Sequence, residues 1–445
     1  MDRSRGGVVV CAPGRLDVLG GAADFAGATT VSVPLDTHVA VALQPTGDDD
    51  AVTIRSSRSC HWDGIAPVRV PLSELREMVA QEADAADEEA DRRPLWVRGC
   101  LGALVEGVRH GVFPPPESGL CLTTGSTFPA ELDCGQWAAL VSAVLAAVLA
   151  IQRKKADVRS LAEICRNVER RWLRRRGCLT DALTALSGRP RAVSVLDGET
   201  RMWEPGPVLD NGVMLIGIDC GFVREDAELR YRRARTAAQM GAELVRRIIE
   251  HEAGDGFRWE GPLCTISPTE YVERFRDRLP TRLQGRDFLD RFDPPDDPFA
   301  HVEPDVIYRV RSRTEHPIYE HRRALEFVEM LRRGLDGDEE GLRNAGELMY
   351  VSHWSCGQRC GLGCPEVDRL VKLLRTQGAG RGIYGARISG CGCGGVVTVL
   401  LRDGQSAWSA VRQVIEAYTA DTGRQARILR TERPGALTGG VQPIN

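Results

Sequence analysis

The chain has 445 residues and a formal net charge of −4, with 42% hydrophobic and 27% charged residues. That length exceeds one ordinary hydrophobic core and suits two domains or a two-lobed enzyme. No concentrated basic segment is present, which argues against a nucleic-acid-binding protein. Arginine greatly outnumbers lysine, and we attribute this to genome composition rather than to phosphate recognition.

The N-terminal residues lack a long apolar region followed by a small-residue cleavage site, so no signal peptide is predicted. The longest apolar run, Ala138–Ile151, is too short to span a bilayer. We therefore expect a cytoplasmic protein whose 14 cysteines are reduced thiols. No membrane or nucleic-acid partner is expected, and the sequence leaves the oligomeric state open.

The first third of the chain alternates valine-rich and charged stretches. Val8–Cys11 and Thr30–Leu43 predict strands, and the glycines and alanines between them allow a ligand to approach the backbone closely. The acidic stretch Gln81–Arg93 has almost no large apolar residues and predicts a solvated helix or an insertion. Leu95–Gly111 predicts an amphipathic helix that ends before the prolines at 114–116.

The middle of the chain has clearer helical and strand patterns. Gly119–Thr124 predicts a strand, residues 136–152 an apolar helix, and Leu161–Arg175 an amphipathic helix. Val213–Asp219 predicts a short buried strand, and Arg230–Glu250 a long helix.

The proline-containing stretch Glu204–Pro207 is the preferred domain boundary, which gives domains 1–207 and 208–445. The segment Asp287–Pro304, rich in Asp and Pro, predicts a loop. No internal repeat is present, so solenoids and propellers are excluded. Strands and helices are mixed without strict βαβ alternation, which favours an α+β fold.

The segment Ala12–Gly27 resembles the first signature of the galactokinase branch of the GHMP sugar and metabolite kinases. Ile266–Tyr271, His316–Glu320 and Asp17–Asp24 are most similar to plant L-arabinokinase, and Gly21-Ala22 stands where most galactokinases carry Glu-His. Other segments resemble the family in the same order along the chain: Arg166–Glu169, Cys178–Asp181, Met349–His353, Gly363–Asp368 and Tyr384–Gly394.

This resemblance implies a two-lobed GHMP kinase fold, with a ribosomal protein S5 domain 2-like N-terminal lobe and a ferredoxin-like C-terminal lobe. It implies an active site between the lobes and an ATP- and Mg²⁺-dependent sugar 1-kinase. The substrates would be ATP and a monosaccharide, either L-arabinose or a galactose-like aldose.

By the same resemblance, Asp181 is the proton acceptor and Arg15 the cation that holds both Asp181 and the phosphate. Taken alone, Asp181 is better explained as a surface or capping carboxylate, but its spacing from Glu169 and the ordered signatures around it favour catalysis. Glu169 would bind Mg²⁺. Glu169 is equally well explained as one more charge on an arginine-rich helix, where Arg170, Arg171 or Arg174 could pair with it.

The resemblance places Asp24, Asp17 and Tyr231 at the sugar, although Asp24 could instead be a turn residue that bonds its own backbone. Gly390, Gly392 and Gly394 of the third signature would bring the backbone near the active centre. A zinc site at Cys391 and Cys393, or among the residues His353, Cys356, Cys360 and Cys364, is disfavoured, because the latter spacings lack the paired C-x₂-C pattern.

The second signature, where relatives grip ATP phosphates, is altered in Phe128–Leu140. Gly135 and Gln136 occupy the positions expected to meet the nucleotide, but Gln136 and Trp137 replace serines and Asp133 replaces a loop glycine. Asp133 with Gln136 suggests a capping box that would occupy the phosphate-binding amides.

Glu131 and Asp133 would also repel a triphosphate, since a unit charge about 4 Å away is worth about 4 kcal/mol at an effective dielectric near 20. Trp137 is expected in the core, with stacking on adenine as the alternative. Three functions follow: a sugar 1-kinase, a catalytically impaired pseudokinase that binds a sugar or a partner, and a repurposed enzyme. The retained Asp181 and Glu169 favour an enzyme.

Overall fold

The computed structural model describes residues 6–47, 49–57, 60, 62, 66–81, 92–132, 134–254, 256–390 and 395–444. The chain forms two compact units. Unit 1 comprises Met1–Arg15, Val33–Pro190 and Arg430–Asn445, and unit 2 comprises Leu16–Ser32 and Arg191–Leu429. Both β1 (Gly7–Leu19) and β2 (Thr30–Gly47) contain residues of each unit.

These units do not coincide with the expected division after residue 207. The chain leaves unit 1 after Pro190, and Glu204–Pro207 lies inside strand β7 (Trp203–Val208), which pairs with β6 (Ala192–Leu196). Proline is compatible with a strand at the margin of a sheet. A proline-containing stretch is therefore not by itself evidence of a linker here.

The strands of unit 1 are mostly antiparallel. The start of β1 pairs with β14 (Val441–Ile444), and β2 pairs with β5 (Gly119–Ser126). β5 runs parallel to β3 (Ala51–Ser56), which pairs with β4 (Val68–Pro71). The strands predicted at Val8–Cys11, Thr30–Leu43 and Gly119–Thr124 are confirmed and extend somewhat further.

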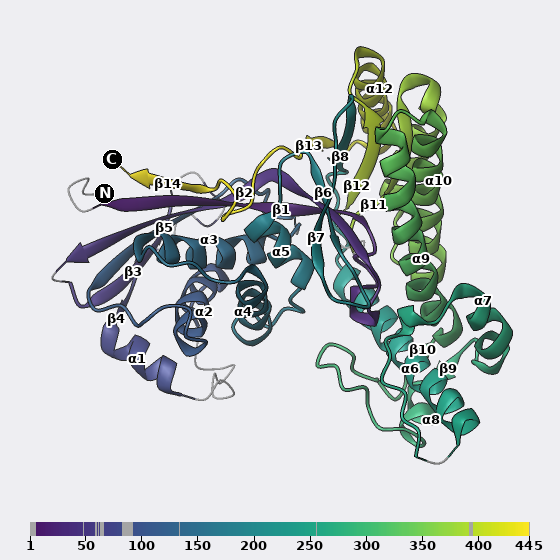
Figure 1. Ribbon diagram of the computed structural model, residues 1–445, viewed down its shortest axis with the longest axis horizontal. Helices are drawn as coiled ribbons and strands as arrows, with labels where there is room; N and C mark the ends of the chain where they lie inside the picture. Colours follow the sequence, from purple (N-terminus) through teal and green to yellow (C-terminus); the bar gives the residue numbers. More distant parts are fainter. Residues whose placement is uncertain are drawn as a thin grey trace. The chain divides into compact units, whose positions relative to one another are not determined.

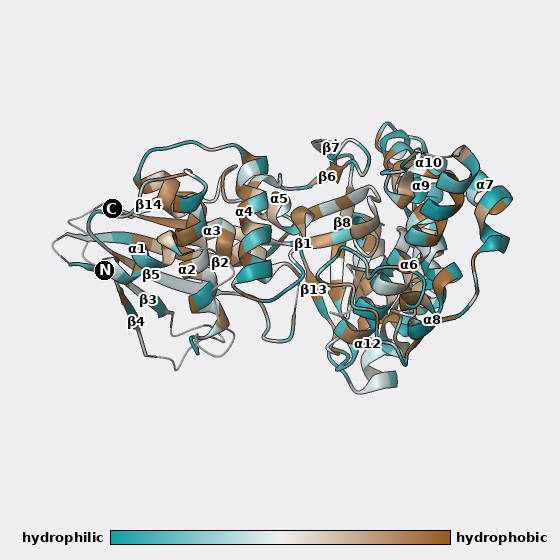
Figure 2. Cartoon of the chain, turned by 90° about the horizontal axis from the view of Figure 1, so that it is seen from below, coloured by the Kyte–Doolittle hydropathy of each residue, from teal (hydrophilic) through white to brown (hydrophobic). Residues whose placement is uncertain are grey.

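The helices of unit 1 gather beside these strands, as Figure 1 shows. The apolar helix predicted at 136–152 is confirmed as α3, and almost all of its residues are buried, as expected for a helix that is hydrophobic all round. In Figure 2, α2 and α3 are largely hydrophobic, whereas α4 carries hydrophilic residues on part of its surface. The helices of this unit are α1 (Leu72–Ala80), α2 (Leu95–Arg109), α3 (Gln136–Ile151), α4 (Val158–Arg171) and α5 (Leu179–Ser187).

Unit 2 contains a four-stranded antiparallel sheet in the order β11-β12-β8-β13. The strand predicted at Val213–Asp219 is confirmed as β8 with the same bounds. Helices α10 and α11 pack on β11, and α9 packs on α10. The elements are β8, β11 (Ile383–Ile388), β12 (Val396–Arg402), β13 (Arg427–Leu429), α9 (Val310–Leu335), α10 (Glu339–Ser355), α11 (Pro365–Gln377) and α12 (Gln405–Thr422).

A helical subregion of unit 2 is centred on α6 (Ala227–Ala253), which confirms the predicted helix at Arg230–Glu250 and packs on α9. The predicted loop Asp287–Pro304 begins inside a short helix and then continues without helix or strand. The short elements nearby are η2 (Asp24–Ala26), η4 (Leu263–Thr265), α7 (Pro268–Glu270), η5 (Tyr271–Phe275), η6 (Arg276–Arg278), β9 (Leu283–Gln284), α8 (Gly285–Leu289), β10 (Ile307–Tyr308), η7 (Cys356–Cys360) and η8 (Ala379–Arg381).

Most of the acidic stretch Gln81–Arg93, from residue 82 to 91, lies outside the described residues. Of the helices that the structure describes, none combines the length and apolar character needed to cross a membrane. All the cysteines among the described residues are free thiols.

Helix α10 approaches strand β11 through two glycines. A Cβ atom at Gly346 would lie 2.0 Å from the carbonyl oxygen of Tyr384, and one at Gly385 would lie 2.5 Å from the Cα of Gly346. The helix backbone therefore rests on the strand backbone with no side chain between them, and only glycine fits at either position.

We expect Gly346→Ala to lower the free energy of unfolding by about 2–3 kcal/mol, because a methyl group forced into a closed backbone contact strains both elements. The midpoint of urea denaturation measures this. Gly357→Ala is the matched control, since a Cβ there meets nothing within 4 Å. Equal midpoints for the two variants would contradict the contact.

Candidate functional site

A buried ion pair joins Arg15 and Asp181 in unit 1. Arg15 lies on β1, and Asp181 lies in the first turn of α5, whose N-cap is Cys178. The Arg15 Nε donates a hydrogen bond to the Asp181 Oδ1, and the two side chains are only 5% and 11% exposed. The contact predicted between these residues is therefore present, and their catalytic roles stay predictions.

The start of helix α3 lies directly beside this pair. Gly135 is its N-cap and has a left-handed φ of 78°. A Cβ atom at Gly135 would lie 3.4 Å from the Cβ and Cγ of Asp181, and the Arg15 N–H donates to the Cys134 carbonyl at 2.8 Å. The positive end of a 16-residue helix thus adjoins a carboxylate and a guanidinium. Such a helix start suits a phosphate group.

The predicted capping box at this helix start is wrong. Asp133 lies outside the described residues, but the N-cap is Gly135, so Gln136 is the first helical residue and not the third. Gln136 is buried, and among the described residues its Oε1 has no hydrogen-bond partner.

Trp137 is 8% exposed, which confirms its expected place in the core. Its ring stacks on Trp62 at 6.2 Å, Trp62 stacks on Trp96 at 6.1 Å, and the Arg175 guanidinium lies 5.7 Å from the Trp137 ring centroid. Glu131, in contrast, is exposed. The replacement of a serine by tryptophan thus adds to the core of unit 1.

Glu169 is a buried carboxylate on α4, 5% exposed. Burial raises the pKa of the neighbouring Cys165 thiol to about 12, and the charge of Glu169 adds to the effect. Within the described part of the chain, no group of three or more His, Cys, Asp or Glu side chains could hold a metal ion. One carboxylate still fits Mg²⁺, because this ion commonly takes one or two carboxylates together with substrate phosphates and water.

In unit 2, Asp17 is held by a fully buried arginine. The Arg387 Nη1 donates to the Asp17 Oδ2 at 2.8 Å, and the side chains are 0% and 1% exposed. The backbone N–H groups of Gly21 and Gly390 donate to the same carboxylate at 3.0 and 3.1 Å. Asp17 therefore anchors the start of the third signature, whose Gly392 and Gly394 lie outside the described residues. Because the Asp17 side chain is only 1% exposed, a sugar could not reach it without a local rearrangement.

The same carboxylate explains the unusual Gly21. A Cβ atom there would lie 2.5 Å from the Asp17 Oδ1. No side chain fits at this position while Asp17 keeps its contacts, so the Glu common in galactokinases could not occupy this conformation.

The buried charges continue to Glu320 on α9. The Arg387 Nη2 lies 3.8 Å from Glu320, the Arg323 Nε donates to Glu320 at 2.8 Å, and the Ser352 hydroxyl donates at 2.5 Å. Burial opposes the charge of Glu320, but Arg323, His316 and Arg387 hold its pKa well below the usual range. This carboxylate is therefore ionised in the folded protein.

His316 lies beside this cluster, and its Nδ1 is 2.9 Å from the Ser355 hydroxyl. Burial lowers the pKa of His316 to about 3; Glu320 opposes this shift, whereas Arg323 and Arg387 reinforce it. The imidazole is thus neutral across the physiological range.

Arg235 lies near two of the predicted sugar-binding residues, Tyr231 and Asp24. It pairs with Asp297 at 2.6 Å, and its guanidinium lies 5.2 Å from the centroid of Phe25. Burial opposes its charge, but Tyr231, Asp297 and Asp24 raise its pKa above the ordinary value. Asp24 is half-buried in η2 and Tyr231 is buried in α6.

Sequence reasoning missed Arg387, Glu320 and Arg235 as parts of these arrangements. Arg387 and Glu320 lie inside segments that resemble the family. A charged residue within a mostly uncharged segment was the sequence feature that could have indicated a buried ion pair. Arg235 lies four residues after Tyr231, one turn along the same helix.

The chain is similar in sequence to known GHMP and sugar kinases. Residues 335–420 match the family described as GHMP kinases C terminal. The chain is 26% identical over 497 residues to L-arabinokinase of Arabidopsis thaliana, covering 96% of this chain and 46% of that protein. It is 24% identical over 332 residues to galactokinase of Thermotoga maritima, covering 74% and 78%. The chain thus spans about half the length of the plant relative.

Solved structures establish the fold. The galactokinase of Lactococcus lactis, solved with galactose, superposes with a TM-score of 0.71 at 16% identity, covering 96% of this chain and 94% of that one. The mevalonate kinase of Methanococcus jannaschii superposes with a TM-score of 0.58 at 12% identity, covering 96% and 98%. The predicted α+β, two-lobed GHMP kinase fold is confirmed.

The shifted pKa of His316 predicts an acid-sensitive fold. Between pH 6.5 and about 3 the unfolded chain binds a proton at this position and the folded chain does not, so stability falls as the pH falls through this window. We expect His316→Gln to reduce the slope of unfolding free energy between pH 6.5 and 5 by up to about 1.4 kcal/mol per pH unit.

Urea denaturation at each pH measures this slope. His251→Gln, at an exposed position, controls for the removal of a histidine as such. If His316→Gln and the unchanged protein show the same slope, His316 is protonated in the folded state at these pH values.

Proposed function

We propose that this protein, a homologue of the galactokinase branch of the GHMP kinases, is an ATP-dependent sugar kinase that phosphorylates the anomeric hydroxyl of an aldose. The observation that carries the proposal is the buried ion pair of Arg15 and Asp181 beside the start of α3. In transfer of a phosphoryl group to a hydroxyl, a carboxylate can accept the proton, a guanidinium can offset negative charge and a helix N-terminus can bind phosphate.

In this proposal Asp181 accepts the proton of the sugar hydroxyl. Arg15 fixes the orientation of the carboxylate through the hydrogen bond to Oδ1. The same guanidinium offsets negative charge on the phosphoryl oxygens as the bond to the sugar forms. Because both side chains are buried, they are placed before the substrate arrives and need little reorganisation.

ATP and Mg²⁺ are the expected co-substrate and cofactor. The backbone at Gly135 and Gln136 would receive nucleotide phosphates, which the position of Gly135 as the N-cap of α3 supports. Glu169 would supply a carboxylate to Mg²⁺, and the bound ion would neutralise phosphate charge. Gly390, Gly392 and Gly394 are proposed to lie against the nucleotide or sugar on the strength of the family resemblance.

For the sugar, we propose direct contacts from Asp24 and Tyr231. We assign Asp17 mainly to positioning, since both of its oxygens already accept hydrogen bonds. Similarity to L-arabinokinase of Arabidopsis thaliana favours L-arabinose, with galactose as the closest alternative.

A second candidate is a kinase fold with impaired catalysis that binds a sugar or a partner. The altered second signature favours this: Glu131 is exposed at the segment expected to meet phosphates, and buried Gln136 and Trp137 replace serine hydroxyls. The intact pair of Arg15 and Asp181 favours the active kinase, because binding alone does not need it.

Incubation with Mg-ATP and a panel of aldoses tests the kinase reaction. We expect a sugar phosphate, detected by mass, with L-arabinose or galactose as the preferred substrate. Asp181→Asn should lower the rate at least about a hundredfold, because a general base typically contributes that much or more.

The matched control is Asp277→Asn, which alters a carboxylate whose side chain is 88% exposed. If the unchanged protein forms a sugar phosphate and Asp181→Asn forms it at the same rate, Asp181 is not the base. Sugar binding without any phosphate transfer would favour the second candidate.

Nucleotide affinity tests the altered signature separately. Calorimetric titration with Mg-ATP is expected to give binding weaker than the micromolar range, because the carboxylate of Glu131 repels the phosphates. Glu131→Gln should tighten binding severalfold, whereas Glu117→Gln, an exposed acid on another loop of unit 1, should not. Micromolar binding by the unchanged protein would show that the altered signature still holds ATP normally.

A further inference from the structure

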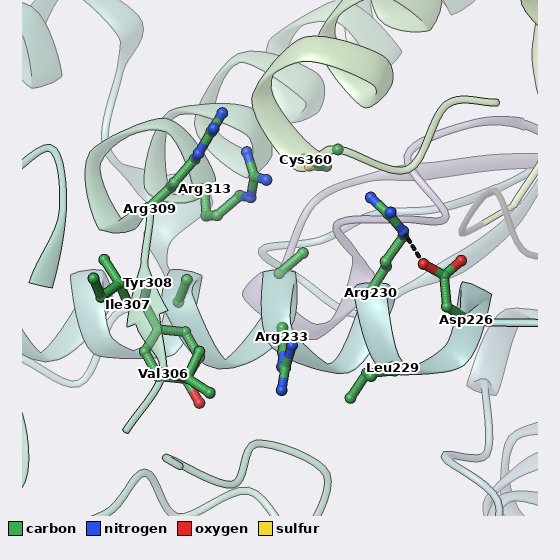
Figure 3. Close-up of a pocket in the computed structure, with 13 residues that line it drawn as sticks. Asp226, Leu229, Arg230, Arg233, Val306, Ile307, Tyr308, Arg309, Arg313 and Cys360 are labelled. Atoms are coloured by element: carbon green, nitrogen blue, oxygen red, sulfur yellow. Dashed lines mark hydrogen bonds and ion pairs between the residues drawn. The ribbon is translucent and has the colours of Figure 1, made fainter. Parts of the chain in front are cut away.

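A pocket in unit 2 is lined by arginines from α6 and from the start of α9. Its volume is about 320 Å³, at the lower end for small-molecule sites. Figure 3 shows Arg230 and Arg233 on α6, Arg309 and Arg313 at the start of α9, and Cys360 nearby. No residue assigned above to catalysis or to sugar binding lines this pocket.

Two of the four arginines have carboxylate partners. Arg230 pairs with Asp226 at 2.5 Å, and Arg233 makes two hydrogen bonds with Glu303 at 3.0 and 3.1 Å. Among the described residues, no carboxylate lies within ion-pair distance of Arg309 or Arg313. Arg309 and Arg313 therefore leave about two positive charges in the pocket lining without a negative partner. A ligand with two negative charges would neutralise them.

The Arg313 guanidinium lies against Gly361, in space that a side chain at position 361 would fill. A Cβ atom at Gly361, which has a left-handed φ of 73°, would lie 2.8 Å from the Arg313 Nη2. Arg313 Nη1 donates to the Ser312 hydroxyl at 3.2 Å. Burial lowers the pKa of Arg313, and the charge of Arg309 lowers it further against the opposing effect of Cys360. Two cations so close to each other gain from a bound anion.

The start of α9 adds to this positive potential. The helix has 26 residues, its N-cap is Arg309, and no acidic residue lies in its first turn. Acidic residues ordinarily occupy this position because they complement the helix dipole. The third arginine here, Arg311, donates instead to the Leu279 carbonyl. The local sequence thus opposes helix stability in a way that an anionic ligand would offset.

We propose that this pocket binds the phosphate group of a small phosphorylated metabolite. The guanidinium forks of Arg309 and Arg313 match the geometry of a phosphate, which carries close to two negative charges as a monoester. Apolar residues on the same wall, including Ile307 with 61% exposure, would contact the carbon body of the ligand.

Calorimetric titration with inorganic phosphate at constant ionic strength tests the site. We expect Arg313→Gln to weaken binding by about tenfold to a hundredfold, since hydrogen bonds to a charged group are worth that much. Arg282→Gln, an arginine in a different pocket of unit 2, should bind phosphate as the unchanged protein does. Malonate, a dicarboxylate, is titrated in parallel.

Arg309→Gln provides a second variant at an exposed position, where folding is not at risk. Circular dichroism and the urea midpoint show whether each variant is folded. Unchanged phosphate binding in both Arg309→Gln and Arg313→Gln would overturn the proposal, as would malonate binding as tight as phosphate. Since the readout is direct binding, its result does not depend on whether the protein proves to be a kinase.

Discussion

The ion pair of Asp17 and Arg387 joins β1 to β11 inside unit 2, and both charges are removed from water. Further hydrogen bonds to the two charged groups help to offset the cost of removing such a pair from water. Here Asp17 also accepts from Gly21 and Gly390, and Arg387 also donates to the Val18 carbonyl at 3.0 Å. Among the described residues, the Arg387 Nε has no hydrogen-bond partner. Removal of either partner would leave a buried charge uncompensated, at a cost of about 3–5 kcal/mol. The backbone around both glycine-containing signatures depends on this contact.

The helix start of unit 1 at which we propose that phosphate binds combines a left-handed glycine with buried side chains. Gly135 keeps the left-handed conformation that brings α3 against Asp181. The side chains that follow serve the core, where Trp137 stacks on Trp62. In the proposed function, backbone groups rather than side-chain hydroxyls would therefore hold the phosphate at this helix start.

Local sequence patterns predicted the helices and strands that are buried along almost their whole length. The apolar run of α3 and the short buried strand β8 were predicted because each is covered on all sides by its own unit. Asp17 and Arg387 are separated by 370 positions in the sequence. The hydrophobic periodicity of local segments cannot predict an ion pair between residues so far apart. The capping box failed for a related reason, since the conformation of Gly135 moves the helix start by two residues relative to the side-chain pattern.

The pair of Arg15 and Asp181 is also distant in sequence, 166 positions apart, yet it was predicted. The prediction came from resemblance to a family rather than from the physics of either segment. The arginine pocket had no such support, because arginines are frequent throughout the chain and only the folded arrangement separates those with carboxylate partners from those without.

The glycine contact between α10 and β11 has a mechanical consequence. Side chains between packed elements ordinarily act as a compliant layer that takes up small displacements by changing rotamer. Where Gly346 meets Gly385 that layer is missing, so we expect the helix and the strand to move together. Ser352 on the helix and Arg387 on the strand both contact Glu320, so this shared motion would keep their spacing constant.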